Sequence, residues 1–297
     1  MSDAQQDLDF YTRHLGLRLV KRTVNFDNHF VYHFYYGNES GTPGTIMTTF
    51  PYQGMGVPEG VKGAGQISAT AFSVPLGSLD FWRRHLQTSG AAVTDVEPRF
   101  GAETIAVADP SGLVLELVAS DDARAPWATD AVAPAHAIRG VHSVALRIRV
   151  PGPTLQFMQE VLGFTVVNES ATRTRVAING DQPGHVIDIV HAPDAPPARN
   201  GLGTIHHVAM AIATEDEQLR MRQELIRWGC QVTEVLDRQY FRSIYFREPG
   251  GVLFEIATIP PGFTIDETLA GLGQELKLPP WEEPHRAEIT ARLPKVS

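Results

Sequence analysis

The sequence contains a single cysteine, Cys230, among its 297 residues. One thiol cannot form a disulfide within the chain, so a disulfide-stabilised scaffold is excluded and the chain fits a reducing compartment. Cys230 follows Trp228-Gly229 after a helical stretch, which favours a thiol packed in the core over a reactive one.

Long apolar runs and an excess of positive charge are also absent. No run approaches the roughly 18 residues that a membrane-spanning helix needs, and the amino-terminal segment MSDAQQDLDF lacks the pattern of a secretion signal. The formal net charge is −9 and the isoelectric point is near 5.6, which disfavours a polyanionic partner. We therefore expect a cytoplasmic protein with neither nucleic acid nor a membrane as its partner.

Several common catalytic motifs are missing as well. The sequence contains no glycine-rich phosphate loop, no cysteine cluster for zinc and no nucleophile elbow. These absences leave no support for a nucleotide-dependent enzyme or a serine hydrolase.

What the sequence does contain is an internal repeat. Residues 9–20 resemble residues 156–167, and looser copies occupy 80–90 and 224–229. Each copy has apolar residues at helical spacing, then a glycine or similar stop, then a β-prone stretch. Alternating apolar strands precede three of the copies, and further strands follow all of them. The preceding strands are predicted at 68–74, 144–148 and 208–212.

The repeat predicts an α+β fold of four βαβββ modules that form paired open barrels. Module boundaries fall near 1–60, 61–120, 136–195 and 200–260. We expect an N-terminal module pair (1–120), a linker (121–137), a C-terminal pair (138–260) and a tail (261–297) with a short helix at 284–293. The first helix is predicted to begin at about Asp3, so we expect the first strand of module one to be missing from this chain, either because the chain starts late or because the protein is incomplete.

Two side chains in the last module suggest a metal site. His206-His207-Val208 is predicted on one apolar strand, and Glu255 lies in a second apolar strand, Phe254-Glu255-Ile256. Such a pair supplies two thirds of the 2-His-1-carboxylate ligand set of non-haem Fe(II) oxygenases. Adjacent strand residues face opposite sides, so only one histidine can enter the site. A strand histidine is more often a core or edge residue, but a buried glutamate needs a partner.

Other polar and aromatic residues leave alternatives open. Ser143 aligns with His207 in module three, and Asp188 aligns with Glu255. A set of His207, Glu255 and Asp188 would suit Mn(II) or Mg(II) better than Fe(II). Glu116, the equivalent in module two, is interpreted as a vestigial or structural carboxylate. A group of aromatic residues could line a pocket for a planar ring or pack their own sheet; they are Tyr32, His33, Tyr35 and Tyr36.

These modules and strand positions resemble the vicinal oxygen chelate superfamily, which contains glyoxalases, bleomycin-resistance proteins and type I extradiol dioxygenases. Within it, the chain is most similar to hydroquinone dioxygenases, which open para-diphenols beside one hydroxyl. The segments that carry this narrower resemblance are 17–24, 31–37, 41–51, 237–241 and 249–255.

The resemblance implies a metal held by His207, Glu255 and a further histidine that would lie before Ser2, in the missing strand, with His206 facing away. It implies Fe(II), with Mn(II) as an alternative, and catalytic positions at Arg238, Tyr245 and Tyr240 that hold and protonate substrate or oxygen. The partners would be a small aromatic diphenol and O2, and a homo-oligomer is left open.

The sequence leaves three other functions open. A glyoxalase-like lyase or isomerase would use Ni(II) or Zn(II) and consume no oxygen. A small-molecule binding protein of the antibiotic-sequestering type needs no metal. A catalytically impaired paralogue would explain the absent histidine ligand.

Overall fold

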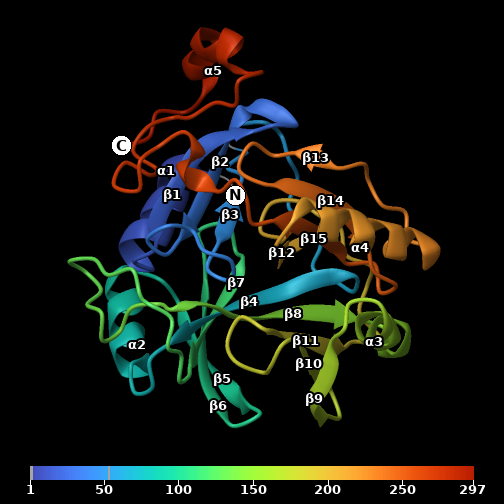
Figure 1. The fold of residues 1–297 in the computed structure, drawn as a ribbon. Helices are drawn as coiled ribbons and strands as arrows, with labels where there is room; N and C mark the ends of the chain where they lie inside the picture. Colours follow the sequence, from blue (N-terminus) through green and yellow to red (C-terminus); the bar gives the residue numbers. More distant parts are fainter. Residues whose placement is uncertain (1–2, 53) are drawn as a thin grey trace. The chain divides into compact units, whose positions relative to one another are not determined.

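A computed structural model describes residues 3–52 and 54–297 (Figure 1). The chain divides into two compact units, the first made of 3–58, 72–141 and 263–297 and the second of 59–71 and 142–262. The chain passes from one unit to the other within strands β4 (Gln66–Val74) and β8 (Gly140–Ile148). Both units contain helix and strand segments of the repeated module, and the predicted α+β class is confirmed.

The third module lies in the second unit. Strands β8 and β11 are parallel, and the sheet order is β8-β11-β10-β9. Helix α3 starts with prolines in its first turn, where the missing N–H groups cost nothing, and it buries Phe157 and Met158. The elements after β8 are α3 (Pro151–Glu160), β9 (Thr165–Ser170), β10 (Arg173–Ala177) and β11 (Val186–His191).

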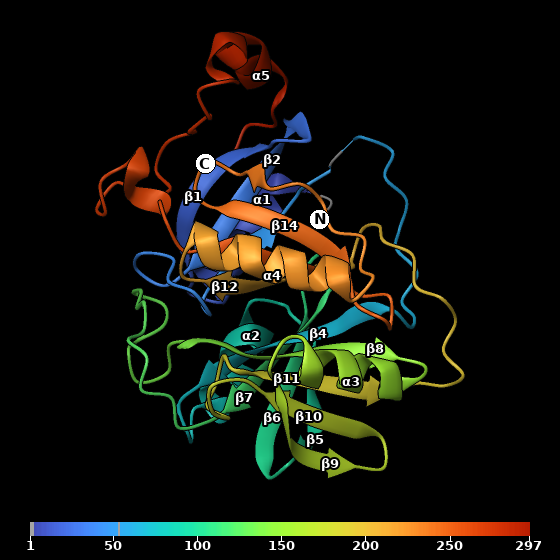
Figure 2. The same cartoon turned by 45° about the vertical axis from the view of Figure 1, so that its right-hand side comes forward.

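The fourth module repeats this plan, with the order β12-β15-β14-β13 and β12 parallel to β15. Helix α4 begins with a capping box between Thr214 and Glu217 and lies across its sheet (Figure 2). The Gln218 amide donates to the carbonyls of Arg242 and Ile256, which ties the helix to β14 and β15. The elements are β12 (Val208–Ile212), α4 (Glu215–Arg227), β13 (Leu236–Asp237), β14 (Arg242–Arg247) and β15 (Leu253–Thr258).

The first unit contains most of the described residues of modules one and two, and residues 59–71 belong to the second unit. Asp3 caps α1 by accepting from the Gln6 N–H, which confirms the predicted helix start. The first sheet has the order β1-β2-β3, and the second contains the neighbours β5, β6 and β7. The elements are α1 (Ala4–Asp9), the π-helix η1 (Phe10–His14), β1 (Arg18–Asn25), β2 (Asn28–Gly37), β3 (Met47–Thr49), α2 (Leu79–Thr88), β5 (Val93–Arg99), β6 (Ala102–Ala108) and β7 (Val114–Ala119).

The aromatic residues of β2 contribute to the core of this unit. Tyr36 stacks on Tyr11 with 4.7 Å between ring centroids, and its hydroxyl donates to Asp7 at 3.1 Å. Tyr32 stacks on Phe34 at 4.9 Å. Of the two interpretations of these tyrosines, the structure therefore places Tyr32 and Tyr36 in packing contacts within their own unit.

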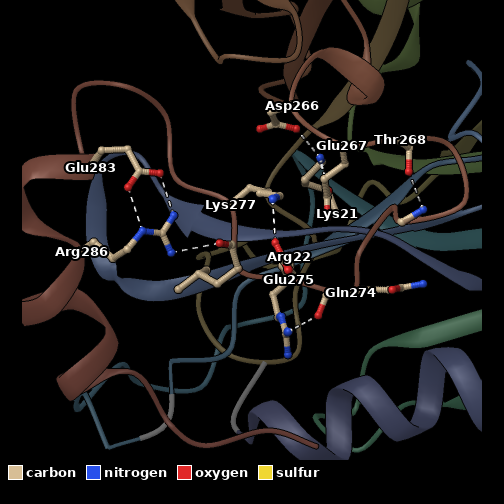
Figure 3. Close-up of polar contacts among 12 residues, drawn as sticks. Lys21, Arg22, Asp266, Glu267, Thr268, Gln274, Glu275, Lys277, Glu283 and Arg286 are labelled. Carbon is tan, nitrogen blue, oxygen red and sulfur yellow. Dashed lines mark hydrogen bonds and ion pairs between the residues drawn. The ribbon is translucent and has the colours of Figure 1, made fainter.

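The C-terminal segment after Gly262 belongs to the first unit and runs along β1. Leu276 forms a parallel bridge with Arg22, whose carbonyl accepts from the Lys277 N–H at 3.0 Å. The Lys21 ammonium, which is fully buried, contacts the carboxylates of Asp266 and Glu267 (Figure 3). The segment contains η2 (Phe263–Ile265), η3 (Glu283–His285) and α5 (Arg286–Arg292), so the predicted tail helix is confirmed.

No helix in residues 3–52 and 54–297 combines the length and apolar character that crossing a membrane requires.

Candidate functional site

Glu255 and His207 meet at one point in the fourth module. Glu255 lies in β15, paired with Ala209 of β12 on one side and Tyr245 of β14 on the other. His207 directly precedes β12, and its Nε2 lies 2.7 Å from Glu255 Oε2. Glu255 is 3% exposed. A carboxylate this deeply buried requires hydrogen-bond or charge partners, and His207 is one of them.

The second oxygen of Glu255 is held by hydroxyl groups. Tyr245 donates to Oε1 at 2.9 Å, and Ser243, fully buried on the same strand, donates to the same oxygen. Burial alone would raise the pKa of Glu255, but the hydrogen bonds and charge of His207 and the two hydroxyls outweigh it, and the net pKa is lowered. Glu255 is therefore held ionised. Its Oε1 accepts the hydrogen bonds of Ser243 and Tyr245, and its Oε2 faces His207.

Arg238 and Tyr245 lie beside this pair. The Arg238 guanidinium carbon is 5.5 Å from the centroid of the Tyr245 ring. Burial raises the pKa of the Tyr245 hydroxyl, the Glu255 charge raises it further, and Arg238 opposes these effects. The hydroxyl therefore stays protonated at neutral pH and can act as a proton donor.

Tyr240 occupies the turn that follows β13. Its backbone N–H donates to the Arg238 carbonyl at 2.7 Å, and its own carbonyl accepts from the Gly262 N–H at 2.9 Å. Gln239 between them has a positive φ of 64°, which makes the turn sharp. The Tyr240 side chain is fully buried. Its catalytic role stays a prediction.

We expected His206 to face away from the site. Its Nδ1 lies 2.9 Å from the Nδ1 of His207, which is not the ring nitrogen that faces Glu255, and the two rings are nearly perpendicular. The strand alternation behind the expectation does not apply, because both residues precede β12, and the orientation of His206 relative to a metal stays a prediction. One of the two facing nitrogens must carry the proton and the other must accept it.

The alternative ligand set of His207, Glu255 and Asp188 is corrected by the structure, because Asp188 is already bound by two arginines. Its two carboxylate oxygens accept from the guanidinium groups of Arg173 and Arg175 on β10, at 2.7 to 2.9 Å. Glu116 is similarly bound to Arg99 at 2.6 Å, in line with a structural role. Both carboxylates are neutralised by arginines on their own sheets.

An imidazole nitrogen of His207 and a carboxylate oxygen of Glu255 lie next to each other, and both side chains are largely buried. Both atoms are of types that bind divalent metals. Within residues 3–52 and 54–297, no cluster of three or more His, Cys, Asp or Glu could hold a metal. The histidine that the resemblance implies before Ser2 lies outside the described residues.

Comparison with known proteins shows the family to which the chain belongs. The sequence matches the glyoxalase/bleomycin resistance protein/dioxygenase superfamily over residues 1–117 and 140–256. The chain therefore belongs to that superfamily.

Similar proteins cover nearly the whole chain. MhqE of Bacillus subtilis, provisionally named a ring-cleaving dioxygenase, is 44% identical over 99% of this chain and 95% of its own length. The chlorohydroquinone/hydroquinone 1,2-dioxygenase of Sphingobium indicum is 36% identical over 96% of this chain and 91% of its own length.

Solved structures support the same fold. A crystal structure of a provisionally named dioxygenase from Bacillus subtilis, 40% identical, superposes with a TM-score of 0.95 over 100% of this chain and 94% of that chain. Glyoxalase I from Zea mays has a TM-score of 0.64 at 12% identity, over 87% of this chain and 89% of its own, and so shows the fold alone.

Proposed function

We propose that this protein is a metal-dependent ring-cleaving dioxygenase that opens a hydroquinone or related diphenol beside one hydroxyl, using O2. The observation that carries the proposal is the convergence of His207 Nε2 and Glu255 Oε2, with Tyr245 and Arg238 beside them. The names of the relatives, which include a hydroquinone dioxygenase, support the choice of reaction and substrate class.

His207 and Glu255 would hold Fe(II), with Mn(II) as the alternative. The bound ion would supply a positive charge that lowers the pKa of a phenolic hydroxyl and open positions for substrate and dioxygen. The carboxylate of Glu255 is already ionised, so it can bind a cation without first losing a proton.

Two neighbouring side chains would serve the reacting groups. The Tyr245 hydroxyl, kept protonated by its surroundings, can give a proton to an oxygen of the substrate. The Arg238 guanidinium, charged at any working pH, can stabilise negative charge on oxygen next to the Tyr245 ring.

Oxygen uptake tests the proposal. Protein supplied with Fe(II) and methylhydroquinone should consume dioxygen in an oxygen electrode, and the variants His207→Ala and Glu255→Gln should not. Conversion of substrate without oxygen uptake would instead indicate a glyoxalase-like lyase or isomerase. Binding of a diphenol without conversion, unaffected by removal of metal, would indicate a small-molecule binding protein.

A further inference from the structure

Ser243 carries a fully buried hydroxyl group next to the candidate site. It lies on β14 two residues before Tyr245, opposite Ala257 of β15 and diagonal to Glu255. Its side chain is fully buried, and its hydroxyl donates to Glu255 Oε1. A serine in a strand interior has little apolar area to contribute, so this contact is the main use of its side chain.

We propose that Ser243 is a positioning residue that fixes Glu255 as a ligand through one oxygen, Oε2, by holding Oε1 away from the metal. The inference rests on the proposed function, because it concerns the same carboxylate.

The reason that a positioning group is needed lies in the carboxylate itself. The terminal torsion of a glutamate is broad and roughly two-fold, so packing alone leaves the plane of the carboxylate free to rotate. Two hydroxyl donors on Oε1 remove that freedom, since turning the carboxylate would break both hydrogen bonds at once. Oε2 then stays directed at His207.

Ser243 and Tyr245 are not equivalent in this arrangement. Tyr245 is partly exposed and lies next to Arg238, so its hydroxyl can turn to a substrate oxygen. Ser243 is short and fully buried, and its hydroxyl donates to Glu255. Ser243 therefore keeps Glu255 in place while Tyr245 serves the reaction.

Mn²⁺ binding, measured from the electron paramagnetic resonance signal of the free ion, tests this role without reference to activity. Ser243→Ala should bind Mn²⁺ about tenfold or more weakly than the wild type, the loss typical of outer-shell groups around metal ligands. The matched control is Thr154→Val. Thr154 is a buried hydroxyl in the same unit that donates to a different buried carboxylate, Glu248, at 2.7 Å. This control should keep wild-type Mn²⁺ affinity.

The possible results separate the inference from the proposed function. If Ser243→Ala and wild type bind Mn²⁺ equally, or if Thr154→Val weakens binding as much, the positioning role is wrong and the proposed function stands. If the wild type binds Mn²⁺ no better than Glu255→Gln, the proposed function is wrong and the inference falls with it.

A second variant keeps the test decisive if Ser243→Ala does not fold. Ser243→Cys keeps the size of the side chain but replaces the hydroxyl with a thiol, which is a weak hydrogen-bond donor, so it should also bind Mn²⁺ more weakly than the wild type. Wild-type Mn²⁺ affinity in Ser243→Cys would overturn the inference.

Discussion

Tyr245 and Glu255 are cross-strand partners in β14 and β15, and the Tyr245 hydroxyl donates to Glu255 Oε1 at 2.9 Å. This single contact joins the candidate metal ligand to the candidate proton donor. Because directly opposite residues in an antiparallel pair lie close together on one face, the sheet register itself brings the two groups to one place.

Tyr245→Phe should therefore lower turnover far more than metal affinity. The change removes a proton donor and leaves both donor atoms for the metal, and loss of a general acid typically costs about a hundredfold or more in rate. Steady-state oxygen uptake measures the first effect, and metal content after dialysis measures the second. Unchanged turnover would remove Tyr245 from the reaction.

His207→Ala should abolish stable metal binding, whereas His206→Ala should weaken it less. His207 supplies the nitrogen that faces Glu255, while His206 contacts the other ring nitrogen of His207. Losing a partner that orients a ligand typically costs about tenfold to a hundredfold in metal affinity. Metal analysis of the two purified variants compares them, and a greater loss in His206→Ala would reverse the assignment.

Lys21→Met should strongly destabilise the protein. Lys21 is fully buried between the carboxylates of Asp266 and Glu267, the latter also buried (Figure 3). Removing the cation leaves buried charge without compensation, which typically costs about 3–5 kcal/mol. Chemical denaturation measures the loss. The control Lys277→Met removes a lysine whose partner, Glu275, is solvent-exposed, and it should change the free energy of unfolding little. Equal effects would show that the Lys21 contacts do not hold the C-terminal segment.

Asp7 should contribute a loss of stability as the pH rises from about 4 to about 7. Burial raises the pKa of Asp7 from 3.8 to about 7 against the hydrogen bonds of Thr49 and Tyr36. Between these two values the folded state binds more protons than the unfolded state, so the free energy of unfolding decreases with pH and levels off above the folded pKa. Asp7→Asn should make this dependence shallower in thermal unfolding. An identical pH dependence in variant and wild type would exclude Asp7 as its source.

The module pattern could be predicted from the sequence because it rests on local signals. The predicted strand 208–212 coincides with β12, and the helix start near Asp3 coincides with the cap of α1. Alternating apolar residues, helical spacing and capping residues act within a few positions of one another, so each segment carries its own signal.

Long-range partners could not be predicted in the same way. Lys21 lies in a β-strand pattern, where a lysine usually faces solvent, and its partner Asp266 is 245 positions away. Asp188 aligned with Glu255 in the repeat, but the two arginines that neutralise it lie on the adjacent strand. Ser243 was missed because a serine carries little signal, although its position two residues from Tyr245 places both side chains on one face of β14.

Product analysis under isotopically labelled dioxygen tests the central proposal most directly. Protein supplied with Fe(II) and methylhydroquinone should form a ring-opened product that carries both atoms of the labelled dioxygen, detected by mass spectrometry. The Glu255→Gln variant should form none. A product with an intact ring, or the same ring-opened product from wild type and Glu255→Gln alike, would contradict the assignment of this site as a ring-cleaving dioxygenase.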